Sequence, residues 1–335
     1  MLVTGGAGFI GSNLVRHLLR TRPEISVTNL DALTYAGSLA NLQGLPVGDG
    51  PGRYAFVHGN ICDRVLVERL IAEQQIDTII HLAAETHVDR SISGPAPFIE
   101  TNITGTFTLL EAARLTWGAN TSGTRRRFHH VSTDEVYGSL EADAPAPTEG
   151  APYAPSSPYA ASKAAADHLV GAYVRTYGLD ATISSCSNNY GPHQFPEKLI
   201  PLMIVNAMRG KPLPIYGDGQ NVRDWLHVED HCEAIVAIVE RGFTGQTYHV
   251  AGGVQRTNLE LVELLCGLLD ARLPDSPHRP HKQLIESVAD RLGHDRRYAL
   301  DTTKIRTELG WSPRHALAEG LAATLDWYLG AERRT

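Results

Sequence analysis

The sequence predicts an α/β protein: a doubly wound parallel sheet with a smaller, mostly helical lobe. Two observations carry this prediction. Short apolar runs alternate with helical stretches through the first half of the chain, and a glycine-rich loop directly follows the first apolar run. Strands that alternate with helices form a parallel sheet covered on both faces. A glycine-rich loop after the first strand is typical of Rossmann-type sheets.

The apolar runs and their spacing place the elements in order. Strands are expected at about residues 2–4, 26–30, 54–58, 78–82, 128–132 and 181–186, and helices at about 10–20, 65–74, 97–115 and 158–177. A helix at about 228–240 and a strand at 247–251 are expected to return to the sheet. We therefore expect one domain over residues 1–186, with about 222–250 returning to it, and a second over residues 187–221 and 251–335.

Composition argues against several classes of partner. The net charge of −7 disfavours nucleic acid and anionic membranes. The four cysteines lie far apart without a CxxC pair, so we expect reduced thiols and neither a metal site nor disulfides. The first strand leaves no room for a signal peptide, and no apolar run reaches the ~18 residues of a membrane span. The sequence therefore predicts a cytoplasmic protein.

The glycine loop predicts a dinucleotide site. Gly5, Gly8 and Gly11 are spaced by three residues between a strand and an amphipathic helix, where they permit a tight turn and close approach of a pyrophosphate. The helix N-terminus supplies amide donors to phosphates. Asp31 stands at the end of the second strand, where a carboxylate accepts from ribose hydroxyls and repels a 2′-phosphate. The expected cofactor is therefore NAD rather than NADP.

A tyrosine and a lysine begin the helix expected at 158–177. Ser157 is a natural N-cap and Pro158 suits the first helical position. The spacing of four residues puts Tyr159 and Lys163 on one helix face. A nearby ammonium and a positive nicotinamide would favour the phenolate, which makes Tyr159 a candidate base for removing an alcohol proton.

Two adjacent carboxylates follow the strand expected at 128–132. Neighbouring side chains on a strand point to opposite faces, so Asp134 and Glu135 can share one pocket only where the chain has already turned out of the strand. Neighbouring carboxyls in a half-buried pocket can be pushed to different pKa values, so that one serves as acid and the other as base. An acid/base pair beside a redox site predicts an elimination coupled to oxidation.

These motifs resemble a known family. The glycine loop with residues 81–91, 132–138 and 159–163 resembles the extended short-chain dehydrogenase/reductases. Within that family, the chain resembles the dTDP-glucose 4,6-dehydratases. The resemblance lies in the Thr133–Glu135 triplet and in residues 186–192, 197–201, 223–231 and 293–298. The resemblance runs from the first strand to Trp327. Related sugar epimerases carry small residues where Asp134 and Glu135 stand.

The resemblance implies a reaction that loses water from dTDP-glucose and gives dTDP-4-keto-6-deoxyglucose. Tyr159 would remove the C4 hydroxyl proton while a hydride passes to NAD⁺, with Lys163 holding the ribose. Thr133 would hydrogen-bond the sugar near its 4-oxygen. Glu135 would take the C5 proton and Asp134 would protonate the departing C6 hydroxyl. The hydride would then return to C6, so that NAD remains bound.

The resemblance also assigns binding residues and domains. The first domain would bind NAD and the second the nucleotide sugar. Cofactor contacts would come from Gly5, Gly8, Phe9, Ile10, Gly11, Asp31, Leu33, Thr34, Asn60, Ile61, Leu82, Ala83, Ala84, Thr101, Tyr159, Lys163 and Asn189. Substrate contacts would come from Thr86, Thr133, Asn188, Lys198, Leu199, Pro214, Ile215, Tyr216, Arg223, Asn258, Arg291, His294 and Tyr298. Cationic side chains among them, such as Lys198 and the two arginines, suit a diphosphate.

Three residues depart from the family pattern. Asn60 stands where the family has Asp beside the adenine, His193 replaces a Tyr, and Leu292 replaces a Pro.

By analogy with the family, the helices at 97–115 and 158–177 would form a four-helix homodimer interface. The alternatives are a nucleotide-sugar 4-epimerase or decarboxylase of the same fold, a UDP-glucose 4,6-dehydratase, and a catalytically silent NAD-sensing regulator.

Overall fold

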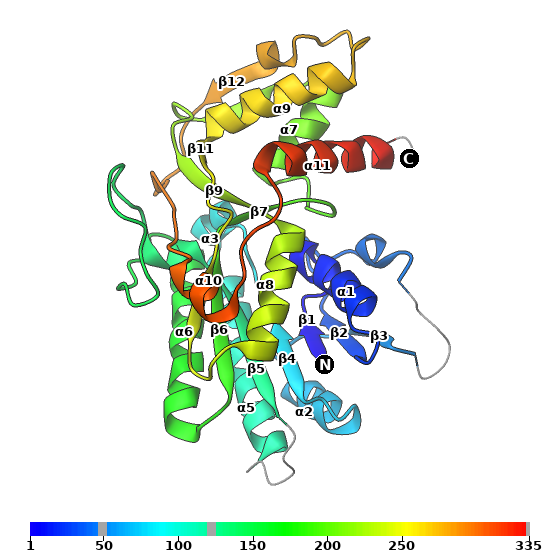
Figure 1. Cartoon of the computed structure of the whole chain (residues 1–335), viewed down its shortest axis with the longest axis vertical. Coiled ribbons are helices and arrows are strands. Elements are labelled where there is room, and N and C mark those ends of the chain that lie inside the picture. Colours follow the sequence, from blue (N-terminus) through cyan, green and yellow to red (C-terminus); the bar gives the residue numbers. More distant parts are fainter. Residues whose placement is uncertain (46–51, 119–124, 333–335) are drawn as a thin grey trace.

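The computed structural model describes residues 1–45, 52–118 and 125–332. Its centre is a seven-stranded sheet with the strand order β10-β6-β5-β4-β1-β2-β3 (Figure 1). Every pair of neighbouring strands in this sheet is parallel. The strands are β1 (Leu2–Thr4), β2 (Val27–Asp31), β3 (Tyr54–His58), β4 (Thr78–His81), β5 (Arg127–Thr133), β6 (Ala181–Cys186) and β10 (Thr247–Val250). The predicted doubly wound sheet is confirmed.

Helices cover both faces of this sheet, as the alternation of strand residues requires. Leu2 and Ile79 pack in a core with side chains of α2 (Arg64–Glu73), α5 (Thr106–Trp117) and α6 (Pro158–Tyr177). Their neighbours Val3 and Ile80 pack on the other face with α1 (Phe9–Thr21) and α8 (Val228–Arg241). Apart from the edge strand β3, the strands are therefore buried on both sides.

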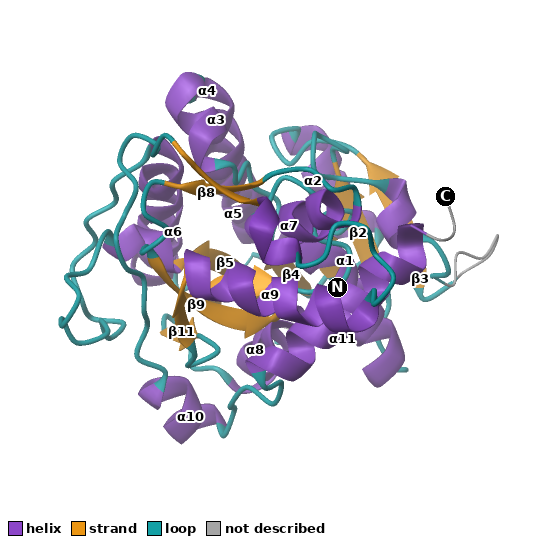
Figure 2. Cartoon of the chain, turned by 90° about the horizontal axis from the view of Figure 1, so that it is seen from above, coloured by secondary structure: helices purple, strands orange, loops and turns teal. Residues whose placement is uncertain are grey.

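A second, smaller part lies beyond the carboxyl ends of the strands (Figure 1). It has a three-stranded sheet of β11 (Gln255–Thr257), β9 (Val222–His227) and β7 (Asn188–Tyr190), and a two-stranded sheet of β12 (Ile285–Val288) and β8 (Leu213–Tyr216). Figure 2 shows its helices α7 (Leu199–Met208), α9 (Asn258–Arg272) and α11 (Leu317–Glu332) above the main sheet. They share one apolar core. Helix α10 (Thr303–Leu309) instead packs against β10 and α8.

The helix predicted at 97–115 is divided in the structure. It consists of α4 (Ala96–Phe98), a π-helical segment at Ile99–Gly105 and α5, and α3 (Val88–Ser93), which the sequence analysis did not predict, precedes it. Short 3₁₀ turns lie at Leu39–Leu42, Asp134–Tyr137 and His281–Leu284. Among the described residues, every helix is too short or too polar to span a bilayer.

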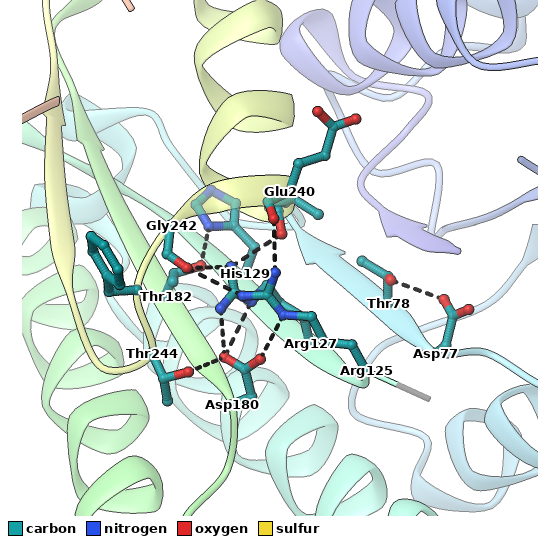
Figure 3. Close-up of polar contacts among 12 residues, drawn as sticks. Asp77, Thr78, Arg125, Arg127, His129, Asp180, Thr182, Glu240, Gly242 and Thr244 are labelled. Atoms are coloured by element: carbon teal, nitrogen blue, oxygen red, sulfur yellow. Dashed lines mark hydrogen bonds and ion pairs between the residues drawn. The ribbon is translucent and has the colours of Figure 1, made fainter. Parts of the chain in front are cut away.

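The amino end of β5 is fixed by a buried arginine (Figure 3). The guanidinium of Arg127 donates to Asp180 Oδ1 at 2.8 Å and to the carbonyl oxygens of Ile238 and Gly242 at 3.0 and 2.7 Å. Asp180 also accepts from Arg125 and from Thr244. This contact ties the start of β5 to the loop before β6 and to the end of α8.

Candidate active site

A cavity of about 320 Å³ opens at the carboxyl ends of the central strands. Ligands bind at this edge in open parallel sheets. The glycine loop and Asp31 line it together with both members of the Tyr159/Lys163 pair and both adjacent carboxylates. Residues far apart in the sequence therefore meet in one cavity.

The glycine loop has the backbone geometry that a pyrophosphate site needs. Gly5 has φ +73°, a conformation that L side chains rarely adopt, and a Cβ on Gly11 would collide with the carbonyl oxygen of Gly5. The carboxylate of Asp31 accepts from the amides of Ala7 at 2.8 Å and Leu33 at 2.7 Å, which fixes it beside the loop. These residues fit NAD, because the cradle admits the pyrophosphate and a fixed carboxylate remains for the ribose.

Nearly all of the predicted cofactor residues line this cavity. Those that do are Gly5, Gly8, Phe9, Ile10, Gly11, Asp31, Thr34, Asn60, Ile61, Leu82, Ala83, Ala84, Thr101, Tyr159, Lys163 and Asn189. Leu33 does not line it and has φ +50° at the turn after β2. The amide oxygen of Asn60 accepts from the backbone N–H of Cys62 at 2.9 Å, so part of its accepting capacity serves the loop itself.

The predicted substrate residues fall into two groups. Thr86, Thr133, Asn188 and Lys198 line the cavity, whereas Leu199, Pro214, Ile215, Tyr216, Arg223, Asn258, Arg291, His294 and Tyr298 do not. In the second group, the Arg223 guanidinium lies 4.3 Å from the centroid of the Tyr298 ring, and Arg291 pairs with Asp89 at 3.7 Å. Both arginines still act electrostatically on Glu135, because each opposes the rise in its pKa. The predicted cations therefore converge on the carboxylates.

The turn predicted after the strand is present. Strand β5 ends at Thr133, whose hydroxyl accepts from the amide of Glu135 at 3.3 Å and caps the 3₁₀ turn Asp134–Tyr137. The same hydroxyl donates to Asp134 Oδ1 at 3.3 Å. Because the chain has left the strand at this point, the side chains of Asp134 and Glu135 both line the cavity.

Burial acts differently on the two carboxyls. Burial, and then the charge of Glu135, hold the pKa of Asp134 well above its ordinary value. Burial also raises the pKa of Glu135, but Lys198 is the first of three cations that oppose this rise. The environment therefore holds Asp134 in its protonated form, whereas the three cations near Glu135 oppose the effect of burial on that carboxyl group.

The hydroxyl of Tyr159 and the ammonium of Lys163 are buried at the cavity wall. Lys163 Nζ donates to the carbonyl of Val131 at 2.7 Å and lies 3.3 Å from His130 Nε2. In the chain alone, burial and the charge of Glu135 raise the pKa of Tyr159 well above its ordinary value. Burial and the charge of Glu135 therefore both oppose the phenolate predicted for Tyr159 in the chain alone.

The sequence analysis missed a charged cluster beside the cavity. Glu197 lines the cavity, and its carboxylate lies 3.6 Å from His87 Nε2 and 3.6 Å from an Arg90 nitrogen. The Arg90 guanidinium lies 4.0 Å from the centroid of the Tyr35 ring, and Tyr35 also lines the cavity. Glu197 directly precedes Lys198, and this adjacency was the available signal.

Among the described residues, one group of side chains is close enough together to hold a metal ion. It consists of His227, Glu229 and His315, outside the cavity lining. His227 Nδ1 accepts from the amide of Glu229 at 3.3 Å, and His315 Nδ1 lies 2.8 Å from Asp230 Oδ1. His227 thus caps α8, and His315 joins the segment before α11 to the first turn of α8, so we assign the group a structural role.

Comparisons with known proteins agree with this site. A family model described as GDP-mannose 4,6 dehydratase matches residues 2–324. The chain is 54% identical to a dTDP-glucose 4,6-dehydratase from Neisseria gonorrhoeae, with 100% of this chain and 96% of that protein covered. It is similar to the dTDP-glucose 4,6-dehydratase DesIV from Streptomyces venezuelae, a crystal structure with NAD and TYD bound (TM-score 0.88, 49% identity, 99% and 98% of the two chains covered). A UDP-glucose 4-epimerase from Thermotoga maritima, solved with UDP-glucose, has a TM-score of 0.85 at 29% identity, with 99% of both chains covered.

Proposed function

The chain belongs to the dTDP-glucose 4,6-dehydratase family, and from that premise we propose that it is an NAD-dependent lyase that converts dTDP-glucose to dTDP-4-keto-6-deoxyglucose and water. One observation carries the proposal: Asp134 and Glu135 share a cavity with Tyr159 and Lys163. An oxidation at C4 needs only the Tyr/Lys pair. The two carboxyls in different electrostatic surroundings supply the acid and base that loss of water also requires.

The cofactor site would be the glycine loop and the residues around Asp31. When bound there, NAD⁺ supplies the hydride acceptor for C4, and its reduced form supplies the hydride for C6. Gly5 and Gly11 leave room for the pyrophosphate against the first turn of α1, whose amides face it. The Asp31 carboxylate accepts from a ribose hydroxyl, and Lys163 binds the second ribose.

The proton steps follow from the positions of the side chains. Tyr159 accepts the C4 hydroxyl proton, and Thr133 hydrogen-bonds the resulting 4-oxygen. The C4 ketone acidifies the C5 hydrogen, which Glu135 removes as base. Asp134, which burial keeps protonated, donates to the C6 hydroxyl as it leaves as water. Glu135 finally returns a proton to C5.

The nucleotide diphosphate would lie between the two parts of the molecule. Lys198 reaches the cavity from the start of α7, and Arg223 and Arg291 approach from β9 and from the loop after β12. An arginine guanidinium can donate two hydrogen bonds to the oxygens of one phosphate group, which suits a diphosphate. We assign the remaining predicted substrate residues around β8, α9 and Tyr298 to the nucleotide and the sugar.

The domain division and the assembly belong to the same proposal. The seven-stranded sheet and its helices form the NAD-binding domain, and the small sheets with α7, α9 and α11 form the nucleotide-sugar-binding domain. Apolar side chains on the outer helices support a homodimer through α5 and α6, since Phe107, Leu115 and Tyr177 are 45, 47 and 53% exposed. The four cysteines are free thiols, as expected of an enzyme of the cytoplasm.

Product analysis with labelled substrate tests the proposed function. With dTDP-glucose deuterated at C4, the label should appear at C6 of a 4-keto-6-deoxy product, and in heavy water solvent deuterium should enter at C5. The same assay with UDP-glucose determines whether the enzyme prefers thymine or uracil as the base of the nucleotide. Formation of dTDP-galactose without loss of water would instead establish an epimerase and exclude the dehydratase.

A further inference from the structure

A buried carboxylate continues the face of α6 that carries Tyr159 and Lys163. Asp167 follows Lys163 by four residues, as Lys163 follows Tyr159, so the three side chains lie on one helix face. Only 3% of Asp167 is exposed. It does not line the cavity and has no part in the proton steps above. A buried carboxylate without a partner is costly, so its surroundings must compensate.

Two hydroxyl groups donate to Asp167 and partly offset the effect of burial on its carboxyl group. Its Oδ2 accepts from the hydroxyl of Ser132 at 2.7 Å and from the hydroxyl of Tyr153 at 3.0 Å. These donors come from β5 and from the segment before α6, so the carboxylate is held between the sheet and the helix. Two donated hydrogen bonds stabilise the charged form of a carboxyl group.

A neutral histidine links this carboxylate to Lys163. His130 Nε2 lies 3.2 Å from Asp167 Oδ1 and 3.3 Å from Lys163 Nζ. Burial, and then the charge of Lys163, hold the pKa of His130 well below its ordinary value, so the imidazole is uncharged. The charges near this ring are therefore the ammonium of Lys163 and the carboxylate of Asp167.

We propose that Asp167 is a positioning residue for the hydride step: it is the buried counter-charge that keeps Lys163 an ammonium, and through Lys163 it sets the pH range in which Tyr159 accepts a proton. The part that concerns Tyr159 rests on the proposed function. The part that concerns Lys163 does not.

The electrostatics around the two groups agree with this geometry. Burial lowers the pKa of Lys163 to about 8, and the charge of Asp167 is the largest effect that opposes it. Burial raises the pKa of Asp167 to about 6, and the charge of Lys163 is the largest effect that opposes that rise. Between these values both groups are charged. The other polar or titratable groups that face the pair are His81, His130, Ser132, Tyr137, Tyr153, His168 and Cys186.

A titration of Lys163 in the NAD-loaded enzyme tests the proposal without turnover. The chain contains five lysines, Lys163, Lys198, Lys211, Lys282 and Lys304, so carbon-13 labelling at lysine Cε gives few signals. Lys163→Met identifies the Lys163 signal. In Asp167→Asn we expect the pKa of Lys163 to fall by about one unit or more, because the main charge that opposes the effect of burial is then absent. At a given alkaline pH, this is about a tenfold loss of the ammonium form. Asp167→Glu should restore most of the difference.

A matched variant separates charge from packing. Tyr153→Phe removes a hydrogen bond from Asp167 but leaves the carboxylate, so the pKa of Lys163 should stay within a few tenths of a unit. The alkaline fall in the single-turnover rate of NADH formation should move to lower pH in Asp167→Asn and remain in place in Tyr153→Phe. An unchanged Lys163 titration in Asp167→Asn, or an equal shift in Tyr153→Phe, would overturn the proposal.

The unaltered enzyme provides a measurement that does not depend on the folding of a variant. Since the two charges interact, the Lys163 signal should show a second, smaller inflection near pH 6, where Asp167 takes up its proton. A Lys163 signal that is flat through this range would overturn the proposal. A normal inflection with no turnover of dTDP-glucose would support the role of Asp167 and contradict only the proposed function.

Discussion

Asp134 and Glu135 are adjacent in the chain but experience different charges. Lys198 is the strongest charge acting on Glu135 and opposes the rise in its pKa, whereas the strongest charge acting on Asp134 is the carboxylate of Glu135 itself. The 3₁₀ turn after Thr133 makes this possible, because it brings both side chains to one cavity. One turn of the chain thus holds two carboxyl groups whose pKa values are set by different charges.

Substitution of each carboxyl should affect a different step. Asp134→Asn should slow the loss of water by about 10²–10⁴-fold, because the leaving hydroxyl loses its acid. Hydride removal should be slowed less. Glu135→Gln should suppress exchange at C5 to a similar degree while NADH still forms. Transient absorbance of NADH and deuterium incorporation at C5 measure the two steps. Glu141→Gln, on an exposed loop, is the control, and equal effects of both substitutions on one step would contradict the assignment.

Removal of the Lys198 charge should change the pH dependence of turnover. Glu135 acts as a base only when ionised, so kcat falls as pH drops through its pKa. Lys198 lowers that pKa, so in Lys198→Met the pKa rises and the acidic fall in kcat moves to higher pH. The measurement is kcat against pH at saturating dTDP-glucose. Lys211→Met, at an exposed position, should leave the profile unchanged, and a fall at the same or lower pH in Lys198→Met would refute this role.

The bound cofactor should be NAD(H) without a 2′-phosphate. The Asp31 carboxylate is fixed by two backbone amides and would repel a phosphate on the ribose. Mass spectrometry of nucleotide released from denatured protein identifies the cofactor. Asp31→Asn should raise the affinity for NADP relative to NAD about tenfold, since one close charge repulsion near a protein surface is worth ~1–4 kcal/mol. Release of NADP as the principal nucleotide from the unaltered protein would contradict the prediction.

Loss of the Arg127 side chain should reduce stability and leave the chemistry intact. Arg127→Ala removes this donor from the carbonyl of Gly242 and from the Asp180 carboxylate, and each lost hydrogen bond to a charged group costs about 1.5–3 kcal/mol. The free energy of unfolding in urea measures this loss, with Arg69→Ala at an exposed position on α2 as the control. The turnover of folded enzyme should remain near normal. A variant as stable as the control would contradict the structural role.

The main sheet could be predicted from the sequence because its strands, apart from the edge strand β3, are buried on both faces. Such strands appear as short apolar runs between helices, and β1, β3 and β6 begin and end at the predicted residues. The short strands of the smaller part gave no such signal. Strand β8 pairs with β12, about seventy residues away, and contains Pro214, so its strand conformation depends on a partner distant in the chain.

The catalytic set was predictable to different degrees. Capping and spacing predicted the Tyr159 helix, and Ser157 indeed accepts from the amide of Ala160. Spacing alone could not place Arg223 and Arg291 near Glu135, because they belong to β9 and to the loop after β12, far from Glu135 in the chain. The spacing of four residues puts Asp167 on the helix face of Lys163, but it could not show the partners Ser132 and Tyr153, which lie 35 and 14 residues before Asp167 in the chain.

The path of the chain between the main sheet and the smaller part restricts how the two can move. The chain leaves the main sheet after β6, returns with α8 and β10, leaves again for β11, returns with α10 and leaves once more toward α11 (Figure 1). Any opening must bend all of these connections together, so the two parts would rotate about an axis that the connections share. We expect such a rotation to move a sugar bound by one part as a unit relative to a nicotinamide bound by the other.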